Sequence, residues 1–200
     1  MIAAIGWSVA VLAVAACSGK LPETRYYQLA AAGQSTASSA GPVIALEPLA
    51  TEAAYDDDRI IYRTSPYRLD YYQYHRWSAP PGVMIGNYLE QAFERTGRFR
   101  GVVREGDAQT AVVLGGRVVA IEEVDVSRGR WVGRVVVELR MSDARTGAVL
   151  WTEQYEEAEP LTVQTPEGLA RALSAAMARI VARAAPTIAE IADRHAIAGR

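Results

Sequence analysis

Two segments in the second half of the chain alternate apolar and polar residues with the two-residue period of a β-strand. They cover residues 111–126 and 131–142, and the polar residues 127–130 between them predict a tight turn. Because both strands exceed the usual length of about 5 to 6 residues, we expect a β-bulge near Gly115–Gly116 or Glu122–Glu123. On the buried face of this hairpin we place Val112, Leu114, Val118, Ala120, Val124 and Val126 from the first strand and Trp131, Val135, Val137, Leu139 and Met141 from the second.

Shorter apolar segments, bounded by turn residues, predict further strands. They are expected at 25–29, 42–48, 59–63, 67–72, 99–104 and 148–156. The sequence Thr64-Ser65-Pro66 predicts a turn that joins two of these strands in a hairpin. Residues 30–41 are small and polar without periodicity, which is typical of a flexible linker.

Apolar residues that recur every three to four positions predict two helices. The first covers 84–96 and ends before Gly97, a common stop signal. The second begins at Thr165, whose side chain is expected to cap a first turn that contains Pro166 and Glu167. We expect Pro186 to kink or restart this second helix. The order of strands and helices predicts an α+β fold, in which two main helices pack on one face of an antiparallel β-sheet.

The N-terminus carries an uncharged apolar leader followed by the single cysteine of the chain, Cys17. A leader of 16 residues is too short to span a bilayer, which takes about 20 apolar residues, but it fits a secretory signal peptide. The sequence VAAC that ends at Cys17 matches a bacterial lipobox, in which the cysteine is acylated and becomes the new N-terminus. A buried structural cysteine after an apolar helix is the alternative. We therefore expect a signal peptide at 1–16, a lipidated tether at 17–24, a single domain at 25–195 and a tail at 196–200.

Ser18 bears on the membrane in which the protein is anchored. Some bacteria use an aspartate at this position to retain a lipoprotein in the inner membrane, so the serine indicates the outer membrane, on its periplasmic face. Several acyl chains on Cys17 would make the anchor stable. A net charge of −2 argues against nucleic acid as a partner, because nucleic-acid binding demands a strong basic surplus. We expect no cofactor besides the covalent lipid.

No catalytic or metal site is predicted, and the chain is not expected to be an enzyme. The two histidines, His75 and His195, lie far apart in the sequence, and neither has a second candidate ligand three or four residues away. His75, Asp70 and Ser78 supply the residue types of a catalytic triad, but proximity in sequence does not establish its geometry. The acidic run at 56–58 lacks the spaced carboxylates of a calcium loop, so we interpret it as a solvated turn.

A segment rich in tyrosine and arginine surrounds the predicted hairpin. Six of the ten tyrosines lie between Tyr55 and Tyr74. Tyrosine, tryptophan and arginine are the residues that most often dominate binding at protein interfaces. The alternative is that these rings pack against the helices or stand in water without a partner. We predict a partner-binding surface made of Tyr62, Tyr67, Arg68, Tyr71, Tyr72, Tyr74, Arg76 and Trp77.

These motifs together resemble those of the ABC-type transport auxiliary lipoproteins, in particular the PqiC-like group. The resemblance begins with Cys17 closely followed by RYYQL at 25–29. It continues with DRIIYR at 58–63 and YRL at 67–69, on the two sides of the hairpin, and with YHRW at 74–77 and its nearby prolines. It ends with a strand pair closed by Thr146-Gly147 before Leu150-Trp151. The likeness spans nearly all of the chain after Cys17. One departure is Ile60, since members of the family often have a proline directly after the arginine.

The resemblance implies an outer-membrane lipoprotein that works with an ABC ATPase, a permease and a protein with a mammalian-cell-entry (MCE) domain. Such systems move phospholipids or other hydrophobic molecules between two membranes. The lipoprotein is thought to dock the periplasmic MCE assembly, as a homo-oligomer and without catalysis. Two alternatives stay open: an envelope assembly or scaffold lipoprotein without a transporter, and an envelope hydrolase built around His75.

Overall fold

The computed structural model describes residues 22–33, 40–104 and 110–198. The predicted signal peptide, Cys17 and the center of the predicted linker lie outside these residues. The elements are β1 (Arg25–Tyr27), β2 (Val43–Leu46), β3 (Ala50–Thr51), the short 3₁₀ helix η1 (Ala53–Tyr55), β4 (Arg59–Ser65), β5 (Arg68–Trp77), α1 (Pro81–Arg95), β6 (Gly101–Val103), β7 (Val112–Ser127), β8 (Arg130–Asp143), β9 (Val149–Pro160) and α2 (Pro166–Ala198).

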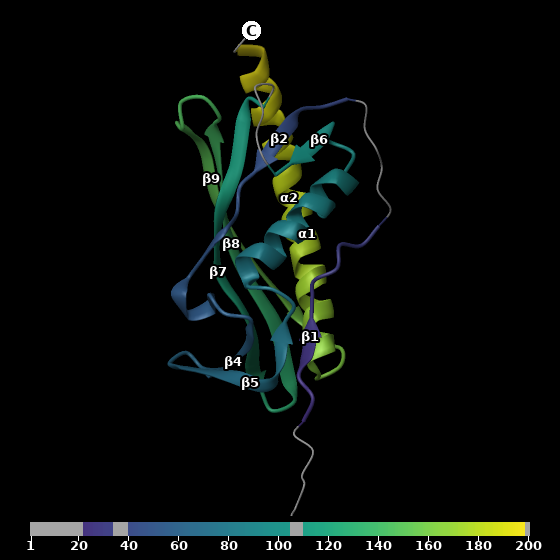
Figure 1. Ribbon diagram of the computed structural model, residues 1–200. Helices are drawn as coiled ribbons and strands as arrows, with labels where there is room; N and C mark the ends of the chain where they lie inside the picture. Colours follow the sequence, from purple (N-terminus) through teal and green to yellow (C-terminus); the bar gives the residue numbers. More distant parts are fainter. Residues whose placement is uncertain (1–21, 34–39, 105–109, 199–200) are drawn as a thin grey trace, which may run out of the picture.

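The long strand β7 lies at the centre of a nine-stranded sheet (Figure 1). Along one edge β7 pairs with β8, which pairs in turn with β9, and these three strands form an antiparallel meander. Along the other edge lie β2, β3 and β4, one after another and all parallel to β7. Beyond β4 the sheet continues with β5 and β1, and beyond β2 it continues with β6.

The α+β class is confirmed, and the sheet is mixed rather than purely antiparallel. The pairs joined by tight turns, β4–β5, β7–β8 and β8–β9, are antiparallel. The parallel pairs all include one of the short strands β1 to β4, whose partners are distant in the sequence. Alternation of apolar residues reports that a strand is half-buried, but it does not report the direction of a distant neighbour. The parallel pairs therefore cannot be predicted from the alternation.

A β-bulge at Val119 switches the buried face of β7. Val118 pairs with Val137 and Ala120 pairs with Val136. Val136 and Val137 are neighbours on β8, so their side chains point to opposite faces of the sheet. The first half of β7 therefore buries the residues predicted for it, whereas Ala120 and Val124 lie on the opposite face. The prediction that they share one face with the first half is wrong. The bulge lies between the two positions at which we expected one.

The partner strand β8 keeps a single alternation throughout, as predicted. Val135, Val137, Leu139 and Met141 are completely buried on the face that both helices cover. Gly133 continues this face where β8 passes beneath α2. A Cβ atom there would lie 3.1 to 3.3 Å from three side chains of the helix, so the glycine lets helix and strand approach closely.

Both helices cover one face of the sheet, as predicted (Figure 1). The helix α2 runs along β7, β8 and β9, and α1 packs between α2 and the strands β3, β6 and β7. The hydroxyl of Tyr88 on α1 donates a hydrogen bond of 3.0 Å to the carbonyl oxygen of Ser174 on α2. The core between the helices and the sheet includes Ile44, Leu46, Ile60, Ile85, Leu89, Phe93, Leu114, Ile121, Leu169 and Met177.

The start of α2 is formed as the sequence predicts. The hydroxyl oxygen of Thr165 accepts a hydrogen bond of 3.1 Å from the backbone N–H of Gly168, which caps the first turn. The helix continues through Pro186 instead of restarting there, because Ala184 and Ile188 on either side remain completely buried against the sheet. Within the three described ranges, no helix is long and apolar enough to cross a membrane.

Candidate interaction site

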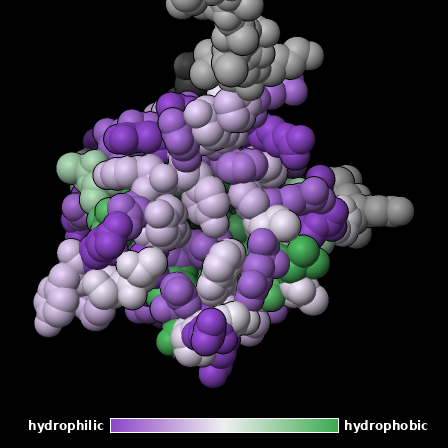
Figure 2. Space-filling model, turned by 90° about the horizontal axis from the view of Figure 1, so that it is seen from below, coloured by the Kyte–Doolittle hydropathy of each residue, from purple (hydrophilic) through white to green (hydrophobic). Residues whose placement is uncertain are grey.

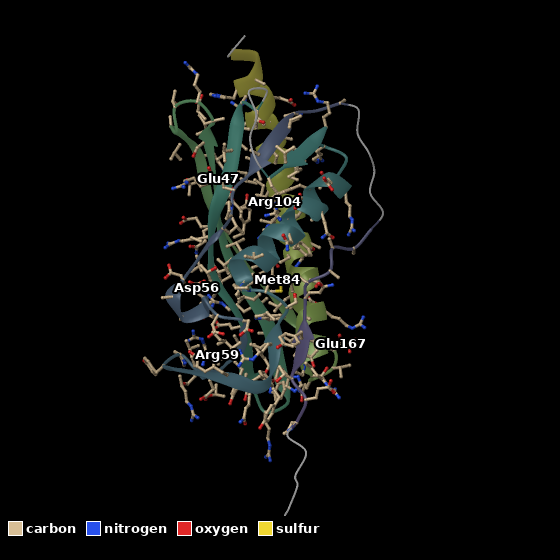
Figure 3. All side chains as sticks on the ribbon, viewed as in Figure 1. Glu47, Asp56, Arg59, Met84, Arg104 and Glu167 are labelled. Atoms are coloured by element: carbon tan, nitrogen blue, oxygen red, sulfur yellow. The ribbon has the colours of Figure 1, made fainter. Side chains whose placement is uncertain are left out.

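The predicted partner surface belongs to the β4–β5 hairpin, which projects sideways at one end of the molecule (Figures 1 and 3). At its tip Tyr67 is 98% exposed. Its neighbour Arg68 is also exposed, and the Arg68 guanidinium pairs with Asp70 at 2.6 Å. On the same hairpin Tyr71 is 41% exposed, and the guanidinium carbon of Arg59 lies 4.0 Å from the centroid of its ring. These side chains are within reach of a partner.

The other predicted residues of this surface lie deeper. Trp77 is 1% exposed and belongs to the hydrophobic core, at the end of β5 that pairs with β1. Tyr62 and Tyr72 are half-buried and meet edge to face, with ring centroids 5.2 Å apart. Tyr74 and Arg76 are also half-buried, and Arg76 forms an ion pair with Asp58, which directly precedes β4. Of the predicted surface, the tip of the hairpin is therefore accessible, whereas Trp77 is not.

Two adjacent glutamates of β7 are the buried acidic groups of the described chain: Glu122 is 0% and Glu123 3% exposed. Successive strand residues face opposite ways, so the two carboxylates lie on opposite faces of the sheet. Glu122 faces away from α1 and α2. Its carboxylate accepts hydrogen bonds from the Tyr55 hydroxyl at 2.6 Å, from Arg63 Nε at 3.1 Å and from Arg134 Nη1 at 2.8 Å. Burial, together with the bond to Glu122, raises the pKa of Tyr55 to about 12.

The contacts of Glu122 tie together three segments that are distant in the sequence: η1, β4 and β8. Glu122, Arg63 and Arg134 also line an open groove of about 680 Å³ between β4 and the end of β7. Two arginines pair with this one buried carboxylate, so the negative charge of Glu122 is already compensated. We therefore interpret the Glu122 network as a structural cluster that fixes the base of the hairpin.

Glu123 has different surroundings on the helix-covered face. The Tyr72 hydroxyl lies 3.0 and 3.1 Å from its two carboxylate oxygens. Among the described residues no arginine, lysine or histidine pairs with Glu123. Burial raises the pKa of Glu123, the bond from Tyr72 opposes this rise, and the nearby charge of Asp125 adds to it. Glu123 is thus a buried acid without a counter-ion.

The raised pKa of Glu123 predicts a pH-dependent loss of stability. Above the ordinary glutamate pKa of 4.5, the unfolded chain releases a proton that the folded protein still holds. The contribution of Glu123 to stability therefore falls as the pH rises from 4.5 to the raised pKa. In Glu123→Gln this loss is absent, and the amide oxygen still accepts from Tyr72. Thermal unfolding between about pH 4 and pH 8 should show the Tm of the variant rising relative to wild type. A constant difference in Tm over this range would contradict the prediction.

In the sequence, Glu122 and Glu123 are predicted only as one of two positions for a bulge. A stronger signal was present, because two adjacent acids inside an apolar strand place one acid on each face, and one must enter the core. The partners of Glu122 cannot be predicted from the sequence. Tyr55, Arg63 and Arg134 come from three separate segments, and nothing in the sequence indicates that they converge.

The residues of the hypothetical triad are not brought into contact. The Nδ1 atom of His75 lies 2.8 Å from the hydroxyl oxygen of Tyr27 on β1. Asp70 pairs with Arg68 instead of His75. In the part of the chain that the structure describes, His75, Asp70 and Ser78 form no hydrogen-bonded relay.

The acidic run at 56–58 is only partly a solvated turn. Asp56 is exposed beside η1 (Figure 3). Asp57 accepts hydrogen bonds of 3.0 Å from both the backbone N–H and Nε of Arg59, and Asp58 pairs with Arg76. The two half-buried aspartates therefore fix the start of β4. Over the described ranges, no three His, Cys, Asp or Glu side chains are close enough to hold a metal ion.

The fold is also found in solved structures. The crystal structure of a Xanthomonas campestris protein, described as a member of the DUF330 family, matches with a TM-score of 0.71 at 15% identity, over 86% of this chain and 97% of its own. A second solved structure, of an uncharacterized protein, matches with a TM-score of 0.68 at 14% identity, over 84% of this chain and 99% of that one. At these identities the likeness establishes the fold alone. No curated protein matches the sequence.

The family itself is established by the sequence. The model of the ABC-type transport auxiliary lipoprotein component matches residues 27–185. This range extends from the end of β1 into α2 and includes the whole hairpin. The match confirms the resemblance that the motifs of the chain indicated. The chain belongs to the family of ABC-type transport auxiliary lipoprotein components.

Proposed function

We propose that the protein docks the MCE-domain protein of an ABC-type transport system, without catalysis, at the periplasmic face of the outer membrane. Its role in transport follows from the family, and the docking surface is the tip of the β4–β5 hairpin. The permease and ATPase of the system are indirect partners, and several copies of the chain act together as a homo-oligomer. The observation that carries the proposal is the exposed Tyr67–Arg68 pair on a hairpin that projects from the sheet.

The tip is ordered before any partner binds. Arg63 Nη1 donates a hydrogen bond of 2.9 Å to the carbonyl oxygen of Pro66, and the backbone N–H of Tyr67 donates one of 3.3 Å to the Ser65 hydroxyl. A surface held in this way loses little conformational freedom on binding. Figure 2 shows this end of the molecule as a mosaic of hydrophilic and intermediate residues with small hydrophobic patches. Such a surface suits recognition by a few aromatic and arginine contacts.

The position of β1 supports a docking site near the membrane. In Figure 1, β1 begins at the same end of the molecule that carries the hairpin. Eight peptide units separate Cys17 from Arg25, and a fully extended chain of that length reaches about 28 Å. A lipid on Cys17 would therefore keep the hairpin end close to the bilayer. Cys17 lies outside the described residues, and the mass of the N-terminal peptide of the purified protein tests its acylation.

Crosslinking in intact cells tests the docking surface. The full-length protein is crosslinked and purified, and the captured proteins are identified by mass spectrometry. We expect an MCE-domain protein among them, with recovery reduced about tenfold in the double variant Tyr67→Ala/Arg68→Ala, because two residues of the hot-spot class are lost. The control is Val149→Ala, a residue that is 58% exposed at the opposite end of the molecule, where β9 begins.

Two results would contradict the proposal in different ways. Unchanged recovery in a folded double variant would remove the hairpin tip as the docking site. Crosslinks that lead only to other envelope proteins, with no MCE-domain protein in the wild type, would favour an envelope scaffold.

A further inference from the structure

A small pocket opens beside Glu123, at the foot of the β4–β5 hairpin. Its volume is about 390 Å³, enough for a small organic molecule. Six of its lining residues are aromatic or acidic: Tyr62, Tyr71, Tyr72, Trp131, Glu123 and Asp125. The strands β4, β5, β7 and β8 all contribute to it, so the lining is built by the fold and not by a single loop.

The pocket concentrates negative charge. Glu123 is 97% buried and accepts a hydrogen bond only from the Tyr72 hydroxyl, and no cation pairs with Asp125 among the described residues. No basic residue lines the pocket. On the other face of the same strand, Glu122 is held by two arginines. A buried carboxylate without a counter-ion is costly, and a cation that enters the pocket would offset this cost.

The aromatic rings select the kind of cation. Tyr62 and Tyr72 are fixed edge to face, and Tyr72 also meets the ring of His75 edge to face at 5.8 Å. The faces of such rings attract cations, and cages of aromatic residues recognise quaternary ammonium groups. A metal ion instead requires several oxygen ligands to replace its water, and Glu123 is the one buried carboxylate that the pocket offers.

We propose that this pocket binds an organic ammonium ion of the choline class. Its quaternary nitrogen lies among Tyr62, Tyr72 and Trp131, and Glu123 and Asp125 balance its charge. The Arg59 guanidinium on the ring of Tyr71 is already paired with Asp57, so it does not occupy this site. The inference does not rest on the proposed docking role, because it concerns a ligand of the folded chain alone.

The test is a titration of the full-length protein in a maltoside detergent with choline chloride, followed by the indole N–H signal of Trp131 in NMR spectra. We expect a saturable shift that sodium chloride at equal ionic strength does not produce. The uncharged isostere 3,3-dimethylbutan-1-ol should bind at least about tenfold more weakly, because it has the shape of choline without its charge. No saturable shift, or equal affinity for the isostere, would overturn the proposal.

Variants locate the site. Asp125→Asn alters an exposed residue, so it leaves the fold intact, and should weaken choline binding about threefold. Glu123→Gln should weaken it about tenfold, because the charge that it removes is buried. Trp151→Phe, on β9 outside the pocket, is the matched aromatic control and should leave the affinity unchanged. Equal affinity in both pocket variants and the wild type would overturn the assignment of the site.

A second titration identifies the source of the ammonium group. Dihexanoyl-phosphatidylcholine, kept below its micelle concentration, presents the same group on a lipid. Tighter binding than choline supports a lipid headgroup as the natural ligand. Binding of choline without binding of the phospholipid supports a free quaternary amine. Failure of both probes would overturn the proposal and leave the crosslinking test of the docking role unaffected.

Discussion

Replacing Glu122 by glutamine should lower the free energy of unfolding by about 3 kcal/mol, at the lower end of the cost of breaking a buried ion pair. The substitution removes the charge that Arg63 and Arg134 share, and it weakens the acceptor of the Tyr55 hydroxyl. The two arginine side chains are 24% and 32% exposed, so they can still be partly solvated. This partial solvation keeps the expected loss from being larger.

The matched control for this prediction is the neighbouring Glu123→Gln. It removes a carboxylate of the same strand that has no ion pair to lose, and its effect should stay within about 1 kcal/mol. Urea unfolding of both variants measures the difference, provided that the slope of the unfolding free energy against urea is unchanged. Equal losses in the two variants would show that the arginines do not depend on Glu122.

Gly116→Ala should destabilise the protein by about 3 kcal/mol or more, because two costs add. Gly116 has a φ of +144°, a backbone conformation that side-chain-bearing residues rarely adopt. A Cβ atom at this position would also collide with the backbone carbonyl oxygen of Glu138 on the paired strand. Since backbone atoms of a β-ladder cannot turn aside, β7 and β8 must separate locally.

Gly115→Ala is the control, one residue earlier in the same strand. Its Cβ would lie 3.2 Å from the carboxylate oxygen of Glu47, the end of a flexible side chain that can move away (Figure 3). We expect a change within about 1 kcal/mol. Thermal unfolding of both variants checks the pair, and a loss in Gly116→Ala no greater than in Gly115→Ala would contradict the collision.

The features that the sequence predicted correctly are those set by near neighbours. The alternation of β8, the turn between β4 and β5 and the cap at Thr165 each depend on residues a few positions apart. The face switch at Val119 is different, because no residue type marks a bulge inside the apolar run at 118–121. The parallel strands likewise depend on contacts between distant segments, which local patterns do not encode.

The same distinction holds for the candidate site. Composition singled out the β4–β5 hairpin, but not which of its aromatic residues would be covered. Trp77 is buried at the end of β5, where the sheet continues with β1, some 50 positions earlier in the sequence. Tyr67, predicted as the first residue of a strand, lies instead in the turn between β4 and β5 and is therefore exposed. The pocket around Glu123 required β8 to bring Trp131 beside it.

The arrangement of β2, β3 and β4 along β7 constrains the order in which the chain can fold. Ala45 pairs with Val113 and Tyr62 with Glu123, so each partner is made more than 60 residues later. The strands β7, β8 and β9 are joined by short turns and close quickly, whereas the distant pairs must first close long loops. During synthesis the N-terminal strands emerge first and have no edge to join. The strands β2, β3 and β4 therefore complete their pairing last. Until they do, the apolar side chains of Ile44 and Ile60 stay exposed to aggregation or to binding by a chaperone.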